Sequence, residues 1–385
     1  MNDTRSRNMY IFLLVLTVAA TGGLQGWRTL FNNFAVEVAG ISGAQMGLLQ
    51  SVREIPGFLS LLAVYVLFLI SQHRLAALSV ILLGLGVSLT GFLPHPSGLI
   101  FTTLLMSFGF HFFETMNQSL TLQYFGVRQA PLVLARLRSV SAATNLVVGG
   151  LIWLLALYLG YTTMFVIMGA AAMLFGLWAL PRDPTRQDLP AQHKKLIFRR
   201  KYWLFYALTF LSGGRRQIFV AFAVFLLVQR YGYDVRHITL LFVINNAVNW
   251  LVNPMIGRAV NRFGERRVLT LEYGSLFFVF LAYALVDNAL VAGLLYVLDN
   301  IFFNFAMAIR TYYQKIADPG DIASGMAVGF TINHIAAVVL PVLGGLAWML
   351  DYRTVFFAAA GMSLVSLLLS QLVNPPEAQE NSESD

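Results

Sequence analysis

The chain has 385 residues, of which 58% are hydrophobic and only 11% are charged, and its formal net charge is +8. Apolar stretches of 20 or more residues recur along the whole sequence, and each is long enough to cross a bilayer as a helix. This composition excludes a soluble globular protein, and the lack of strand-type alternation argues against a membrane barrel. The chain has no cysteine, which excludes disulfides and thiolate metal sites.

Twelve apolar segments are predicted to span the membrane as helices, which makes the fold class an all-α membrane protein. Turn residues separate them, among them Gly40, Gly160, Gly232 and the Asp318–Gly320 run. The predicted helices cover residues 9–38, 43–70, 74–93, 98–126, 131–158 and 161–180, and then 201–231, 235–260, 266–286, 288–316, 322–349 and 352–373.

A polar segment divides these spans into two groups of six. We predict an N-terminal six-helix bundle at residues 1–180, a cytoplasmic linker at 181–200 and a C-terminal six-helix bundle at 201–373. The acidic tail at 374–385 is predicted to be disordered, because it has too few apolar residues to form a core.

The distribution of basic residues predicts the orientation. Of the 26 Lys and Arg residues, 18 fall on the side that holds both termini and three on the opposite side. Because cytoplasmic loops carry the excess of Lys and Arg, we expect both termini in the cytoplasm and the chain in the cell (inner) membrane. The basic linker is then a topological signal, and no nucleic-acid partner is expected.

The two halves contain a weak internal repeat. The tripeptide at 34–36 recurs at 222–224, which places Arg28 opposite Arg216. Two further short matches follow in the same order, 112–114 with 302–304 and 149–153 with 344–348. A parallel duplication of six spans predicts a substrate site between the halves, near the middle of the membrane.

Five arginines lie inside predicted spans: Arg28, Arg53, Arg215, Arg216 and Arg310. An arginine at the centre of a membrane helix costs roughly 2.5 kcal/mol or more, so such residues usually face a cavity. Arg310 falls closer to the inner surface, and we expect its side chain to reach that surface.

Further polar residues fall at the same depth, counted at about 1.5 Å per residue from the outer turns. Their helical spacing gives polar stripes, which must face protein or water because lipid offers no hydrogen bonds. The residues predicted to bind substrate are Arg28, Arg216, Arg215, Gln25, Asn32, Asn245, Asn249, Asn300 and Asn304.

Five titratable residues in the same layer are candidates for proton coupling: Glu114, which is the first choice, Asp299, Glu54, His111 and His334. Histidine titrates near neutrality, and carboxylates in a low-dielectric cavity bind protons more readily than in water. Structural roles are the alternative, as an ion pair for Arg53 and Glu54 and as a core histidine for His334.

No metal site or other cofactor is expected. His111 and Glu114 lie three residues apart on one helix, a spacing that two metal ligands can have. Without a second such pair, this spacing is too weak a signal to predict a bound ion.

The segment 257–267 (GRAVNRFGERR) resembles the loop signature of the major facilitator superfamily. Asn261 stands where that family usually has Asp, and the matching first-half segment, 69–74, lacks the Gly and the Asp-Arg pair. The resemblance implies two pseudo-symmetric six-helix bundles that work by alternating access. The residues we assign to gating at the inner mouth are Gly257, Asn261, Arg262, Gly264, Arg266 and Arg138.

The arginines favour an anionic solute, because the planar guanidinium matches a carboxylate or phosphate with two parallel hydrogen bonds. Through Arg28 and Arg216 the chain resembles the organic-anion and organophosphate carriers of that superfamily. We therefore expect a secondary transporter of a small organic anion, coupled to protons and monomeric in the bilayer, and no enzyme activity.

Two other functions remain open. A proton-driven exporter of hydrophobic or cationic compounds would use Glu54, Glu114 and Asp299 as cation ligands. Against it, the segment 131–158 lacks the Gly-Pro motif of drug antiporters and 98–126 lacks their arginine. A membrane-embedded enzyme or sensor is less supported, because no nucleophile–base pair or phosphate loop is present.

Overall fold

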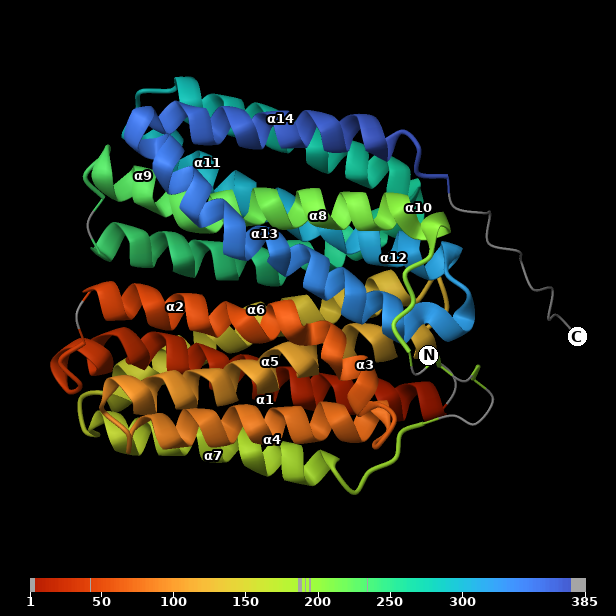
Figure 1. The fold of residues 1–385 in the computed structure, drawn as a ribbon, viewed down its shortest axis with the longest axis horizontal. Coiled ribbons are helices and arrows are strands. Elements are labelled where there is room, and N and C mark those ends of the chain that lie inside the picture. Colours follow the sequence, from red (N-terminus) through yellow and green to blue (C-terminus); the bar gives the residue numbers. More distant parts are fainter. Residues whose placement is uncertain are drawn as a thin grey trace, which may run out of the picture.

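The structure is a computed structural model, which describes residues 4–41, 43–185, 189–190, 192–193, 195–233 and 235–374. Within these residues every regular element is a helix (Figure 1). The first half contains α1 (Thr4–Glu37), α2 (Gly43–Phe58), η1 (Leu59–Leu62), α3 (Ala63–Val66), α4 (Gln72–Thr90), α5 (Pro96–Tyr124), α6 (Ala130–Leu155) and α7 (Tyr161–Ala179).

The second half follows the same plan with more interruptions. It contains η2 (Arg200–Tyr202), α8 (Trp203–Ile218), the π-helical turn η3 (Phe219–Ala223), α9 (Val224–Gln229), α10 (Val235–Leu285), α11 (Ala289–Phe303), η4 (Asn304–Ala306), α12 (Met307–Ile316), η5 (Pro319–Asp321), α13 (Ile322–Leu350) and α14 (Tyr352–Ser370).

These helices confirm the predicted twelve membrane spans. Among the described residues, nine helical segments are long and apolar enough to cross a membrane. Three further spans bring the number to twelve: α13, the segment α2–η1–α3, and a second span within α10. α2 contains Pro56, which removes a backbone donor, and its helix tightens to a 3₁₀ turn at Leu59. α10 is broken at Gly264, whose φ of +78° favours glycine.

Two helical bundles make up the molecule (Figure 1). In the first, α4 packs against α5 and α7, and α1 packs against α6 and α7; in the second, α8 packs against α13 and α14, and α10 against α11 and α14. The start of α1 and the end of α14 lie at the same end of the bundles, which we call the terminus side. The domain limits at 180 and 200 stay predictions, and the predicted tail lies outside the described residues from 375 onward.

The bundles contact each other at the end that holds the termini. Asn261 Nδ2 donates to the carbonyl of Arg128 at 2.6 Å, and Gln314 Nε2 donates to the carbonyls of Leu122 and Phe125, each at 2.7 Å. These bonds join α10 and α12 of one bundle to the α5–α6 turn of the other. They close the space between the bundles on this side.

A second contact lies between α2 and α13. Thr331 Oγ1 donates to the carbonyl of Phe58 at 2.9 Å and accepts from the backbone N–H of Leu61 at 3.0 Å. A Cβ at Gly57 would lie only 2.6 Å from Nε2 of His334. The glycine therefore leaves the space that the imidazole occupies.

The described part of the linker lies against the start of α13. Gln192 Nε2 donates to the carbonyl of Pro319 at 2.7 Å, and the backbone N–H of Ile197 donates to Ser324 Oγ at 2.7 Å. Directly after the linker, Lys201 Nζ lies 2.6 Å from a carboxylate oxygen of Asp318, and this hydrogen bond lowers the pKa of Asp318. The linker is therefore held to the second bundle by specific contacts.

Glycines bring the backbones of α4 and α5 into contact. A Cβ at Gly86 would lie 2.8 Å from Met106 Cα, and one at Gly109 would lie 2.5 Å from the carbonyl oxygen of Ser79. Small residues at such crossings allow the close packing that holds membrane helices together.

Gly109→Ala tests this packing. We expect the added methyl group to separate α4 from α5 and to destabilise the protein by about 1–3 kcal/mol, the usual cost of overpacking. The matched control is Gly149→Ala on α6, where a Cβ would meet no atom within 4 Å. Thermal unfolding of the purified proteins in detergent provides the comparison, and equal unfolding temperatures for the two variants would contradict the packing argument.

Candidate functional site

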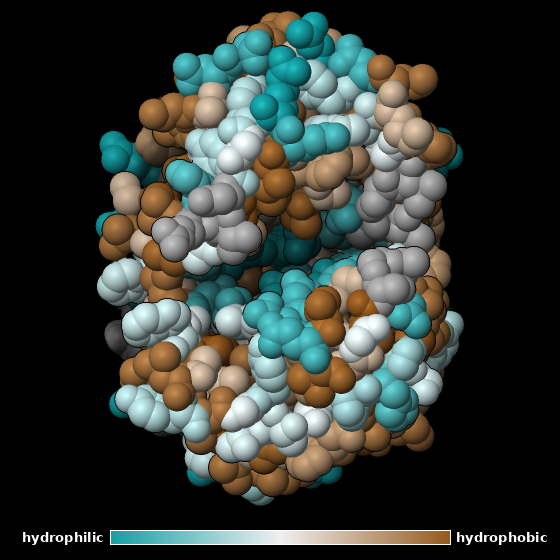
Figure 2. All heavy atoms as spheres, turned by 90° about the vertical axis from the view of Figure 1, so that its left-hand side faces the viewer, coloured by the Kyte–Doolittle hydropathy of each residue, from teal (hydrophilic) through white to brown (hydrophobic). Residues whose placement is uncertain are grey.

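A cavity of about 440 Å³ lies between the two bundles. Residues of α1, α5 and α6 line it from the first bundle, and residues of α8, α10, α11, α12 and α13 line it from the second. Figure 2 shows that it opens at the end opposite to the termini and that polar residues line the hollow. Its volume is in the range of small-molecule sites.

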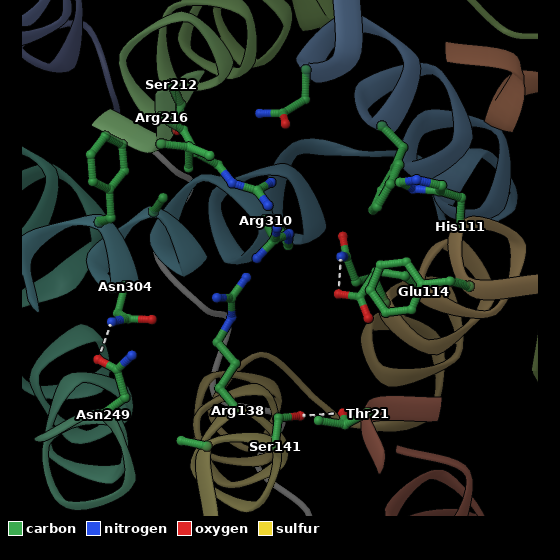
Figure 3. A pocket seen from close by; sticks show the side chains of 18 of the residues that line it. Thr21, His111, Glu114, Arg138, Ser141, Ser212, Arg216, Asn249, Asn304 and Arg310 are labelled. Carbon is green, nitrogen blue, oxygen red and sulfur yellow. Dashed lines mark hydrogen bonds between the residues drawn. The ribbon is translucent and has the colours of Figure 1, made fainter. Parts of the chain in front are cut away.

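Four arginines and one carboxylate provide the charge of this cavity: Arg28 on α1, Arg138 on α6, Arg216 on α8, Arg310 on α12 and Glu114 on α5. Figure 3 shows Arg138, Arg216 and Arg310 pointing toward one another, with Glu114 across the space. Glu114 accepts a hydrogen bond from Gln118 Nε2 at 2.7 Å. The cavity is therefore strongly cationic.

The cavity arginines lack partners. Within the described residues, no hydrogen bond and no ion pair within 4.0 Å involves Arg28, Arg138, Arg216 or Arg310. Arg310 instead experiences the like charges of Arg138 and Arg216 and, more weakly than the first of these, the opposite charge of Glu114. Arg28 likewise experiences the like charges of Arg53 and Arg216 and the opposite charge of Glu54.

Asparagines form a neutral part of the wall. Asn249 Oδ1 accepts from Asn300 Nδ2 at 3.1 Å and from Asn304 Nδ2 at 2.8 Å, and all three residues line the cavity. Gln25 also lines it and donates to Thr29 Oγ1 at 3.1 Å. Asn32 and Asn245, which we also expected at the substrate site, are not lining residues.

Arg215 does not face the cavity, contrary to the sequence prediction. Its side chain is 0% exposed; Nη1 donates to Ser366 Oγ, Nη2 lies 3.9 Å from Glu272 Oε1, and the guanidinium lies over the ring of Tyr273. Successive residues on a helix point about 100° apart around its axis, so the neighbours Arg215 and Arg216 face different surroundings. Arg216 faces the cavity, and Arg215 lies inside the second bundle.

Asp299 is a second correction. It is 0% exposed, both carboxylate oxygens lack a hydrogen-bond partner among the described residues, and it does not line the cavity. Its electrostatic neighbours include Tyr283 and Tyr296 of the second bundle. The position of Asp299 therefore does not support the predicted proton-coupling role in the cavity.

Arg138 and Arg310 are the lining residues that the sequence analysis misplaced. We expected Arg310 at the inner surface and Arg138 among the gating residues of the inner mouth, but both side chains enter the cavity (Figure 3). Depth counted along one helix does not reveal how far the cavity extends toward the closed end. The only signal in the sequence was an arginine within an apolar helix.

The other predicted gating residues lie where the bundles meet or close to it. A Cβ at Gly257 would lie 2.7 Å from the carbonyl oxygen of Pro131, and Asn261 makes the hydrogen bond to Arg128. Gly264 is the break in α10, Arg262 lies over the ring of Phe263, and Arg266 donates to Gln371 within its own bundle. Their roles in gating stay predictions.

Glu54, His111 and His334, three of the proton-coupling candidates, lie together although they come from α2, α5 and α13. His111 and His334 line the cavity, whereas Glu54 does not. Glu54 pairs with its neighbour, because Arg53 Nε and Nη2 donate to Oε1 at 3.2 and 2.8 Å. The cluster joins the two bundles at one side of the cavity.

Twelve membrane spans in two bundles around a polar cavity that is open at one end define a membrane transporter. The chain belongs to the Major Facilitator Superfamily, whose sequence model matches residues 6–341. It is accordingly a multi-pass membrane transporter and not an enzyme. A search of curated proteins finds no match.

Solved structures with the same fold include three transporters. The human organic anion transporter MFSD10 (TETRAN) matches with a TM-score of 0.79 and 12% identity over 96% of this chain and 100% of that one. The E. coli fucose:proton symporter FucP has a TM-score of 0.76 at 13% identity, with 95% and 98% covered. A bacterial homologue of the iron transporter ferroportin, in an outward-facing state, matches with a TM-score of 0.74 and 14% identity over 95% of this chain and 99% of that one. At these identities the likeness concerns the fold.

Glu272→Leu tests the placement of Arg215. Removing the carboxylate leaves a buried guanidinium without its counter-charge, so we expect a loss of stability of about 3–5 kcal/mol, and Arg215→Met together with Glu272→Leu should restore most of it. Thermal unfolding in detergent measures both. The control, Arg216→Gln, removes one of several like charges at an exposed cavity residue and should not reduce stability; a loss equal to that of Glu272→Leu would contradict the distinction between the two arginines.

Proposed function

We propose that this transporter moves a small organic anion together with protons, by alternating access between its two bundles. The observation that supports this most is the set of four cavity arginines, for which the described residues provide no hydrogen-bond or ion-pair partner. Arg28 and Arg138 belong to the first bundle, and Arg216 and Arg310 belong to the second. An anion between them would contact both bundles at once.

Electrostatics favours an anion over a neutral or cationic solute. Unit charges about 4 Å apart interact with about 4 kcal/mol at the effective dielectric constant of a protein surface. Four positive charges around one small space therefore repel each other, and an anion with several oxygen atoms relieves this repulsion. Arginine also fixes the orientation of carboxylate and phosphate groups through paired hydrogen bonds.

The asparagines and the aromatic residues of the wall suit an organic anion more than a simple inorganic ion. Asn249, Asn300 and Asn304 offer amide groups to the cavity, while the rings of Phe110 and Phe330, which also line it, pack against the ring of His111. Ligand sites commonly combine apolar walls with a few polar groups that fix orientation.

Glu114 is the residue that we propose for proton coupling. It is the one carboxylate among the described residues that line the cavity, and it lies within electrostatic range of Arg138 and Arg310. Protonation removes its negative charge and so increases the attraction for an anion. By linkage, the anion favours protonation of Glu114 to the same extent, which is the thermodynamic basis of symport.

The orientation is part of the same proposal. With both termini on the cytoplasmic side of the inner membrane, the cavity opens to the outside, and its closed end faces the cytoplasm. The solute then enters from outside, and the hydrogen bonds of Asn261 and Gln314 must break before the cavity opens inward. A monomer is sufficient for this cycle, because one chain supplies both bundles.

A proton-driven exporter of cationic compounds has less support. Of the three carboxylates that it would need, Asp299 is buried in the second bundle, Glu54 is paired with Arg53, and only Glu114 lines the cavity. The four arginines would repel a cationic solute.

Uptake into proteoliposomes tests the anion proposal. With a panel of radiolabelled carboxylates, phosphate esters and cationic dyes, we expect anion uptake, and we expect Arg28→Gln and Arg216→Gln each to reduce it about tenfold or more, the loss that one charged hydrogen bond of 1.5–3 kcal/mol implies. Arg182→Gln, at an exposed arginine of the linker that does not line the cavity, is the control. Transport of cationic dyes that both variants leave intact would support the exporter instead.

Glu114→Gln tests the proton coupling. The wild-type protein should take up the anion faster when the side of the vesicle to which the cavity opens is made acidic. The amide keeps the size of the side chain but cannot exchange a proton, so uptake by the variant should lose this pH dependence. Glu37→Gln, at an exposed glutamate outside the cavity lining, should keep it. An unchanged pH profile in Glu114→Gln would assign the proton to another group.

A further inference from the structure

Two histidines and one glutamate meet at the contact between the bundles. In Glu54, His111 and His334, one possible ligand atom of each side chain lies within 4.8 Å of the others. His111 and His334 are 6% and 5% exposed, and their rings meet edge to face with centroids 4.8 Å apart. His334 Nε2 lies 3.9 Å from Glu54 Oε2.

The hydrogen bonds of these residues leave metal-binding atoms free. Nδ1 of His334 lies 2.8 Å from the carbonyl oxygen of Phe330, and because a carbonyl only accepts, Nδ1 carries the proton and Nε2 has its lone pair available. Such a bond from the second ring nitrogen is typical of histidines that bind metal ions. Nδ1 of His111 is buried and has no hydrogen-bond partner in the described part of the chain.

Glu54 also has an oxygen atom available for a metal ion. Both contacts from Arg53 go to Oε1, which orients the carboxylate, and Oε2 faces His334. Three atoms separated by at most 4.8 Å share a centre about 2.8 Å from each, so movements below about 1 Å reach the 2.0–2.2 Å of zinc–nitrogen and zinc–oxygen bonds. Two imidazoles and a carboxylate are a ligand set suited to divalent transition metals.

We infer that Glu54, His111 and His334 form a binding site for a divalent transition-metal ion such as Zn²⁺ or Co²⁺. The sequence analysis did not predict it, because spacing within one helix brings together only His111 and Glu114, whereas the ligands come from α2, α5 and α13. Since α13 belongs to the second bundle, the ion joins the two bundles and stabilises the conformation in which they meet here. This site takes a ligand of different chemistry from the proposed anion.

The arginines around the cluster make the binding of a cation less favourable. Arg53 and Arg216 act on His111, and Arg28 lies within electrostatic range of both Arg53 and Glu54. These positive charges oppose the ion, so removing one of them should strengthen binding. An anion in the cavity would have the same effect, which links the occupancy of the two sites.

Titration of the purified, metal-free full chain in detergent with ZnCl₂ tests the inference by calorimetry, and the absorption spectrum of added Co²⁺ reports its ligands. We expect one strong site. His111→Gln, His334→Gln and Glu54→Gln should each weaken binding about tenfold or more, because each removes a direct ligand. Arg28→Gln should strengthen it several-fold, which a merely structural role of the cluster would not produce.

His95→Asn is the matched control, because it removes a histidine outside the cluster while asparagine can still accept at the start of α5. Its binding should equal that of the wild type. Absence of binding to the wild-type chain, or equal binding by the wild type, His111→Gln and His334→Gln, would overturn the inference. Size-exclusion profiles identify misfolded variants, and Arg28→Gln, at an exposed residue, provides a readout that does not remove a ligand. Because binding is measured without transport, failure of the anion proposal leaves this test valid.

Discussion

The need to accommodate charge within a membrane shapes this protein. A guanidinium in hydrocarbon is tolerated only when it has water, a counter-charge or a ligand beside it. Arg215 has a counter-charge in Glu272 and the face of Tyr273, and Arg53 has Glu54. Arg28, Arg138, Arg216 and Arg310 instead face a cavity between the bundles. The Arg215 contacts hold α8 to α10, whereas Arg53 and Glu54 pair along α2 itself. The four cavity arginines give the space between the bundles its positive charge.

The two bundles give this cavity one open end. At the other end, side chains of α10 and α12 bond to backbone carbonyls at the α5–α6 turn, and α2 packs against α13 through Gly57 and Thr331. Alternation between open and closed ends requires such contacts to form on one side while they break on the other. Glu54 and His334 lie at the α2–α13 contact, so an ion bound there as proposed would hold this contact closed.

The fold was largely predictable from the sequence, because long apolar segments and a basic linker specify helices, their number and their order. The repeat around residues 34–36 and 222–224 also led to Arg28 and Arg216. Side-chain direction was harder to predict. Arg215 and Arg216 are neighbours in sequence but face different surroundings, which depends on the rotation of α8. Two further features depend on how separate helices pack: the entry of the Arg310 side chain into the cavity, and the contact among Glu54, His111 and His334. A single sequence carries no signal for that packing.

The hydrogen bonds that close the terminus-side end have a further consequence. Asn261, Gln314 and Thr331 are uncharged, and among the described residues the bonds they make between bundles join them to backbone carbonyl and N–H groups. Dissolved salt screens interactions between charges over about 8–10 Å at physiological ionic strength, but it affects neutral hydrogen bonds little. The closure should therefore tolerate wide changes in salinity, while attraction of solute ions to the guanidinium groups weakens as salt rises.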